Sequence, residues 1–303
     1  MNSIDSILQF HRLLSLPDPL HPLVSVVNLE DVRLKNDPIL EKFTTTFYSV
    51  SLKRDVQAKM KYGQNYYDFD KGILSFTAPK KIQILDLKDI DVTDNGAGTG
   101  YVLLFHPDFL GTHSIAAAIK KYGFFSYEMN EALHLSEKEE KDIIDIFLKI
   151  KNEHQFIDQH TQDIIISQID LLLNYCNRFY QRQFITRKPV NNDVLTKMEN
   201  ILDEYFELEE PLKNGLPTVE FLSDKLNVSP HYLSDMLRSL TGQNAQQHIH
   251  EKLIDKAKEY LSSSKLSVAE IAYQLGFEYP QSFNKLFKKK TEMSPLEFRQ
   301  SFN

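Results

Sequence analysis

The sequence predicts an α+β protein with a β-rich N-terminal domain and an all-helical C-terminal domain. Between residues 23 and 106, short runs of β-branched and aromatic residues alternate with turn sequences, which is typical of strands. Beyond this region the apolar residues recur at three- and four-residue spacing, which indicates helices. The C-terminal part also contains an internal near-repeat. A chain of 303 residues fits two domains, which we expect at 1–188 and 189–303.

The N-terminal domain is predicted to be a small barrel or sandwich. Its strand-like runs are 23–27, 43–50 and 73–76, and residues with turn chemistry separate them. Several short strands joined by regular turns are typical of a closed barrel or of two packed sheets.

Helices are predicted for residues 111–183. Ser136 and Glu139 have the spacing of a capping box, and residues 161–183 carry an apolar stripe that includes Cys176. Such helices either cover the β-rich core or form a homodimer contact through residues 136–183, and the pattern favours neither arrangement. We interpret Cys176 as a buried thiol that fills space.

The charge is distributed unevenly in the C-terminal part. Residues 186–193 are polar and contain a proline, which predicts a linker. Residues 193–213 then carry two basic and seven acidic side chains, whereas residues 214–303 carry eleven basic and ten acidic ones. The overall charge of −7 therefore does not exclude nucleic acid as a partner, because the acidic residues gather before the segment that would bind it.

Composition disfavours several function classes. One cysteine excludes an intramolecular disulfide and a cysteine-rich zinc site, and no His-x-His with a following Glu offers a cupin metal site. The sequence has neither a phosphate-binding glycine loop nor a nucleophile elbow. We therefore expect no enzymatic activity, no cofactor and no metal. The lack of a leader pattern and of a long apolar run predicts a cytoplasmic protein without membrane contact.

The near-repeat predicts two helix-turn-helix units, at 218–241 and 267–291. Thr218 and Ser267 stand where they can cap the first helix of each unit, and apolar residues at matching offsets give each helix a buried stripe. A helical bundle without a nucleic-acid role would show the same apolar spacing. It would not require matched caps and turns, so the repeat favours DNA binding.

The turns and the segment between the units complete this pattern. Gly276 and its counterpart Asn227 suit the left-handed backbone of a turn between two helices. Residues 245–262 predict a connector helix. Two helices that read one face of B-DNA must lie ~34 Å apart, and a rigid connector provides a fixed separation.

The second helix of each unit has small polar and basic side chains opposite its apolar stripe. Amide side chains can read adenine edges in the major groove and lysines can reach guanine, so this face predicts binding of double-stranded DNA. The side chains are His231, Ser234 and Arg238 in the first unit, and Gln281, Ser282, Asn284, Lys285 and Lys288 in the second.

Segments 268–277, 283–289 and 293–299 resemble the signature of the AraC/XylS family of transcription regulators, and the resemblance extends over residues 195–302. It implies that the second helix of each unit enters one of two successive major grooves. For the N-terminal half it implies a cupin-like barrel followed by helices. In that plan the barrel binds a small effector, the helices dimerise, and the regulator contacts RNA polymerase. The resemblance suggests an activator, while the residues themselves leave activation and repression open.

The resemblance also implies roles for individual residues. Arg238 and Lys288 would grip phosphate. Asp235 joins the side chains that face bases, together with His231 and Ser234 in the first unit and Gln281, Ser282, Asn284 and Lys285 in the second.

Three residues depart from the family pattern. Asp235 replaces a polar or basic residue, and it would either accept from cytosine N4 or stabilise its helix dipole. Pro280 begins the second reading helix without an N–H to donate. Glu292 replaces a glycine, which predicts a different cap at that helix end.

Two alternative functions from other classes of protein remain open. One is a cupin-type enzyme with a DNA-binding tail, and the other is a non-enzymatic interaction scaffold.

Overall fold

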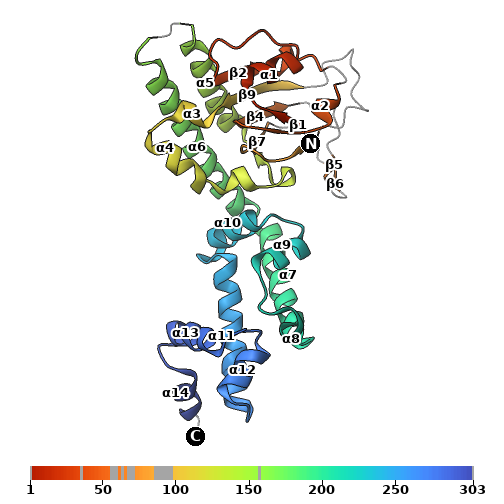
Figure 1. The fold of residues 1–303 in the computed structure, drawn as a ribbon, viewed down its shortest axis with the longest axis vertical. Coiled ribbons are helices and arrows are strands. Elements are labelled where there is room, and N and C mark those ends of the chain that lie inside the picture. The colour runs from red at the N-terminus through yellow and green to blue at the C-terminus, as the bar shows by residue number, and fades with distance from the viewer. Residues whose placement is uncertain are drawn as a thin grey trace. The chain divides into compact units, whose positions relative to one another are not determined.

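The computed structural model describes residues 2–34, 37–54, 61–62, 65–66, 72–84, 98–155 and 158–301. The chain divides into two compact units, Met1–Gln183 and Phe184–Asn303. The first combines strands and helices, whereas the described part of the second is helical throughout (Figure 1). The fold is therefore mixed, with a helical C-terminal region, as the sequence predicts.

A five-stranded antiparallel sheet forms the centre of the first unit. Its strands are rich in β-branched and aromatic residues, which fit a pleated and half-buried surface. They are β2 (Val24–Asn28), β4 (Tyr48–Arg54), β7 (Ile73–Thr77), β9 (Thr99–Phe105) and β10 (Leu133–His134). The strand order is β10–β7–β4–β9–β2, and in the middle strand Val50 lies between Phe76 and Leu103.

The remaining described strands form two smaller sheets. One has the order β1–β3–β8, with β1 (Asn2–Ile4), β3 (Lys42–Thr45) and β8 (Gln83–Ile84); the other pairs β5 (Lys61–Tyr62) with β6 (Asn65–Tyr66). Within the described ranges no sheet closes on itself, so the predicted cupin-like barrel is not confirmed. Closure depends on strand tilt and stagger, which a count of strand-like runs does not reveal.

Helices surround these strands. Two predictions made for them are confirmed: Ser136 and Glu139 form a reciprocal capping box, and Cys176 is buried, which raises the pKa of its thiol. The helices are α1 (Ile7–Leu13), α2 (Pro38–Glu41), α3 (Pro107–Leu110), α4 (Ser114–Ala118), α5 (Glu137–Glu153) and α6 (Thr161–Thr186), with 3₁₀ turns at Leu29–Asp31, Ile119–Lys121, Gly123–Ser126 and Met129–Glu131.

Both faces of the five-stranded sheet pack against other elements. Val102 of β9 lies against an apolar cluster that contains Ile7 of α1. Its neighbour Tyr101 points to the opposite face, because side chains alternate along a strand, and stacks on Phe147 of α5 with ring centroids 6.2 Å apart. The sheet is thus an interior layer of the unit.

The predicted linker at 186–193 is wrong. α6 extends to Thr186, and α7 (Lys188–Glu207) begins two residues later. A proline is tolerated in the first turn of α7, where its missing N–H would have no partner in the helix. The buried Asn191 side chain donates to the carbonyl of Phe184 at 2.7 Å, which satisfies an acceptor near the end of α6. The polar segment therefore marks a helix start.

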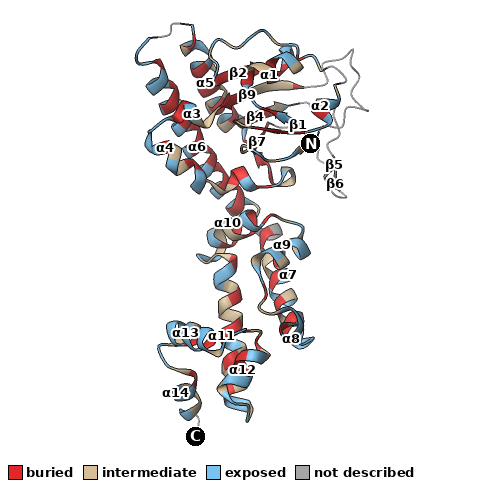
Figure 2. Ribbon diagram, viewed as in Figure 1, coloured by how far each residue is buried: buried red, intermediate tan, exposed pale blue. Residues whose placement is uncertain are grey.

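The second unit consists of consecutive helices on which buried and exposed residues alternate (Figure 2). After α7 they are α8 (Glu210–Asn214), α9 (Val219–Leu226), α10 (Pro230–Thr241), α11 (Ala245–Ser263), α12 (Val268–Gln274), α13 (Pro280–Thr291) and α14 (Pro295–Gln300). Among the residues that the structure describes, no helix combines the length and apolarity required to cross a membrane.

Candidate nucleic-acid interface

The first helix-turn-helix consists of α9 and α10. Thr218 caps α9 as predicted, since its hydroxyl oxygen accepts from the N–H of Phe221 at 3.1 Å. α9 ends at Asn227, whose φ of 55° is left-handed, and the Val228 N–H then donates back to the Ser223 carbonyl at 3.1 Å. This tight reversal sends the chain directly into α10.

The second helix-turn-helix repeats that construction with α12 and α13. Ser267 forms a capping box with Glu270, so this cap is also as predicted. At the turn, Gly276 has a φ of 88° and Phe277 donates to the carbonyl of Ala272 at 2.9 Å. The same hydrogen bond therefore closes both turns.

Each second helix is held by an apolar stripe that faces its partner. Leu233 and Leu237 of α10 are fully buried, and so are their counterparts Phe283 and Phe287 of α13. The ring of Phe283 also packs at 5.5 Å from that of Phe277, just after the turn. Burial of this stripe fixes which face of α10 and of α13 remains in solvent.

The solvent face of α13 carries all five side chains that were predicted there. Gln281, Ser282, Asn284, Lys285 and Lys288 are all exposed. Within the described part of the chain, none of these side chains makes a hydrogen bond or ion pair with the protein. They are therefore available to a ligand.

The corresponding face of α10 is more confined. His231 and Arg238 are exposed, whereas Ser234 and Asp235 are half-buried. The carboxylate of Asp235 accepts from the guanidinium of Arg238 at 3.0 Å, one helical turn away. This ion pair directs Arg238 along the helix and offsets its charge.

α11 joins the two helix-turn-helix pairs and contacts helices of both. Asn244 and Gln247 cap it with a reciprocal box, and its buried stripe includes Ile249 and Leu253. The helix packs against α9 and α10 of the first helix-turn-helix. It also packs against α12 of the second helix-turn-helix and against α14. It begins at the residue expected from the sequence and ends one residue later than expected.

The departures at the end of α13 have a local explanation. Glu292 takes a left-handed φ of 64°, the conformation that Gly242 adopts at the end of α10. The chain then enters α14, which Ser294 and Glu297 cap with a box. The glutamate thus keeps the helix end that a glycine would favour, at a cost of about 1 kcal/mol for a left-handed non-glycine residue.

Two exposed side chains beside the predicted ones have no role assigned from the sequence, although Lys289 belongs to the basic run 285–290. Tyr279, the residue before α13, is 59% exposed. Its position matches that of Ser229 in the first helix-turn-helix. Ser229 caps α10, whereas Tyr279 makes no capping bond. Lys289 is exposed next to Lys288. The signal for Tyr279 was a large aromatic residue at a capping position.

A comparison with protein-family models matches residues 222–301 to a helix-turn-helix domain. The match begins within α9 and runs through α14, so it covers both second helices, α10 and α13. The C-terminal domain is of the AraC type.

The AraC-type domain has curated and structural relatives. The chain is 33% identical over 81 residues to the transcriptional activator RhaS of Citrobacter koseri, which covers 27% of this chain and 29% of that protein. It is 25% identical over 146 residues to the uncharacterized transcriptional regulator YijO of Escherichia coli, 48% of each. The C-terminal domain of the response regulator yesN of Fusobacterium nucleatum matches at 32% identity and a TM-score of 0.32, over 35% of this chain and 98% of that one. The chain spans less than half the length of these curated relatives.

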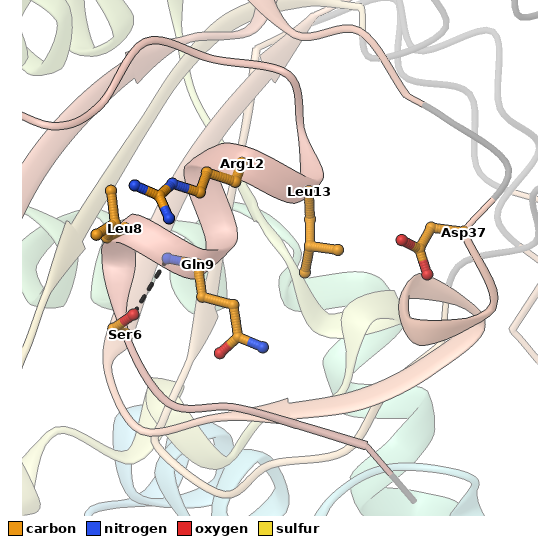
Figure 3. A pocket seen from close by; sticks show the side chains of 6 residues that line it. All are labelled: Ser6, Leu8, Gln9, Arg12, Leu13 and Asp37. Atoms are coloured by element: carbon orange, nitrogen blue, oxygen red, sulfur yellow. Dashed lines mark hydrogen bonds between the residues drawn. The ribbon is translucent and has the colours of Figure 1, made fainter.

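The first unit contains a pocket of about 380 Å³ beside α1 and the start of α2 (Figure 3). The side chain of Arg12 is 65% exposed and pairs with Asp18 at 3.4 Å, while Ser6 accepts from the Gln9 N–H. The residues that line the pocket are Ser6, Leu8, Gln9, Arg12, Leu13 and Asp37. Because none of these polar groups is buried and aimed into the pocket, it does not define a ligand.

Proposed function

We propose that the protein is a sequence-specific transcription regulator whose α10 and α13 read two successive major grooves of double-stranded DNA. The observation that carries this proposal is the repeated construction: two capped helix pairs joined by α11, each with a second helix whose polar face stays in solvent. The AraC type of the domain and the regulator names of its relatives support it.

Base contacts are assigned to the polar side chains nearest the start of each reading helix. Amide and hydroxyl groups read base edges by hydrogen bonding, and lysine reaches guanine. The base-reading residues are His231, Ser234 and Asp235 on α10, and Gln281, Ser282, Asn284 and Lys285 on α13.

Phosphate contacts are assigned to Arg238 and Lys288, with Tyr279 and Lys289 as additions. Each is exposed at or beside a reading helix. Such contacts fix the register of a protein on DNA and make its binding depend on salt. Because the pairing with Asp235 offsets the charge of Arg238, we expect a shallow salt dependence and a large share of affinity from base contacts.

The first unit is proposed to regulate DNA binding through a small effector or through dimerisation. Ile164 and Leu171 are apolar, each 41% exposed, and lie seven residues apart on α6, so they share one helix face. That face suits a contact with a second copy of the chain. RNA polymerase is the further partner, and the activator names of RhaS proteins favour activation.

The experiment is selection of random double-stranded DNA by the purified full-length chain at moderate salt. We expect an enriched site with two short elements. The matched control is a variant in which Asn284 and Lys285 are both changed to alanine, which should lose the α13 element and keep the other. Enrichment of no sequence by the parent chain would contradict the proposal and favour an interaction scaffold.

A further inference from the structure

A backbone contact joins the two halves of the AraC-type domain at Gly276. This residue lies in the turn of the second helix-turn-helix with a φ of 88°. A Cβ atom built on it would lie 2.6 Å from the carbonyl carbon of Gly215 and 2.7 Å from its oxygen. Real Cβ atoms do not approach backbone so closely, so a side chain at Gly276 would force the two segments apart.

The first helix-turn-helix shows that the turn itself does not require this glycine. Asn227 occupies the equivalent position, has the same left-handed conformation and is exposed. The two repeats therefore differ here for a reason outside the turn. Gly276 is needed because the chain at Gly215 packs against it.

Gly215 is held in turn by α7. The hydroxyl of Tyr205 donates to the Gly215 carbonyl at 3.0 Å. The ring of Tyr205 packs at 5.0 Å from that of Phe221 in α9, the first helix of the first helix-turn-helix. The Tyr205 hydroxyl is protonated at neutral pH, and burial raises its pKa further. A continuous set of contacts thus runs from α9 through Tyr205 and Gly215 to Gly276.

This set is a second link between the helix-turn-helix units. The first link is α11, which continues into α12 through the short segment 264–267. α11 itself packs against α12 and α14, and the contact at Gly215 adds a restraint on the second helix-turn-helix that does not pass through α11. α8, which precedes Gly215, also packs against α12.

We propose that the Gly215–Gly276 contact, positioned by Tyr205, sets the rotation of the second helix-turn-helix relative to the first, and so the spacing of the two DNA elements that the domain accepts. The inference rests on the proposed DNA-binding function. One base pair of spacing rotates an element by roughly 34° about the DNA axis, so a small rotation of α13 changes the preferred spacing.

The test measures affinity for a series of DNA duplexes. Each carries the two elements selected by the parent chain, at the selected spacing or with one or two base pairs added or removed. Gly276→Asn keeps a residue type that tolerates the left-handed turn but adds the clashing Cβ. Gly242→Asn is the matched control, since Gly242 has a φ of 81° and nothing within 4 Å of a built Cβ.

We expect the parent chain and Gly242→Asn to prefer one spacing by about tenfold, a typical penalty for one misplaced base-pair contact. Gly276→Asn should prefer a different spacing or lose most of that preference, while it still binds each element alone. Tyr205→Phe, which removes only the hydroxyl, should weaken the preference in the same direction, and it decides the matter if Gly276→Asn does not fold.

An unchanged spacing preference in folded Gly276→Asn, or in Tyr205→Phe where the former is unfolded, would overturn the proposal. That result differs from a failure of the proposed function. In the latter case the parent chain itself would select no DNA site, and the series could not be built because DNA binding would already have been disproved.

Discussion

Lys285 is the side chain whose removal should show most directly that α13 contacts bases. It is exposed on the solvent face of the helix. Lys285→Ala should weaken binding to the selected site by about 1–3 kcal/mol, because a base contact is lost without a replacement. Titration at one fixed salt concentration measures the change. Lys138→Ala, an exposed lysine in the first turn of α5, should bind as the parent does, and equal affinity of Lys285→Ala would remove Lys285 from the interface.

Asp235 should limit the affinity of α10 for DNA in general. Its carboxylate pairs with Arg238, and in the proposed complex it would place a negative charge beside the phosphates. Asp235→Asn should therefore strengthen binding to unrelated DNA and steepen the plot of log affinity against log salt by about one unit, since one more cation is engaged. A salt series on a non-specific duplex measures this. A lower slope, or none of the expected gain, would show that Asp235 does not oppose phosphate.

How well single residues were predictable differs between the two reading helices. On α13 the polar pattern was sufficient, because Phe283 and Phe287 bury the opposite face and leave the predicted residues in solvent. On α10 the same reasoning named Asp235 and Arg238 separately. Their ion pair follows from side-chain orientation, which spacing alone does not reveal.

The start of α12 should depend on its cap. Ser267 accepts from the N–H of Glu270 at 3.2 Å, and Glu270 accepts in return from the N–H of Ser267. Ser267→Ala should lower the free energy of unfolding by about 1 kcal/mol, because an N–H at the helix start loses its partner. Denaturant unfolding measures this. Ser262→Ala, at an exposed position within α11, is the control, and an equal effect of both changes would contradict the capping role.

Helices were more predictable than their surroundings. Caps are local signals, so Thr218, Ser267 and Ser136 could be assigned from their own neighbours in sequence. The junction between α6 and α7 was misread because Pro and polar residues occur both in linkers and in first turns. The predicted barrel is not confirmed, because closure of a sheet depends on pairing between strands that are far apart in the sequence. The contact between Gly215 and Gly276 has no sequence signal except two glycines.

Acid should destabilise the chain partly through three histidines of its first unit, of which His11 and His154 are buried. Burial lowers the pKa of His11, His21 and His154 below the ordinary value of 6.5. The unfolded chain therefore binds more protons than the folded one as pH falls, so the stabilisation that these neutral rings provide is present above pH 6.5 and is lost below it. Carboxylates with a lowered pKa, such as Glu139, stabilise the fold above their ordinary pKa of 4.5 and lose that stabilisation only in more acidic solution.

The contribution of His154 can be isolated by substitution. The side chain of His154 is buried, and its ring centroid lies 6.2 Å from that of His21. His154→Phe should reduce the fall in melting temperature between about pH 7.5 and about pH 5.5, because one group that gains a proton on unfolding is gone. Thermal unfolding of the full chain at the two pH values measures this. An unchanged pH dependence would show that His154 is not the titrating group.

The proposed function requires α10 and α13 to act on DNA as one body. Hydroxyl-radical footprinting of the full-length chain on its selected site measures whether they do. We predict two protected stretches on the same face of the duplex, with centres about 10.5 bp apart. A single protected stretch, or two stretches on opposite faces, would contradict it, because α10 and α13 would then not read successive major grooves together.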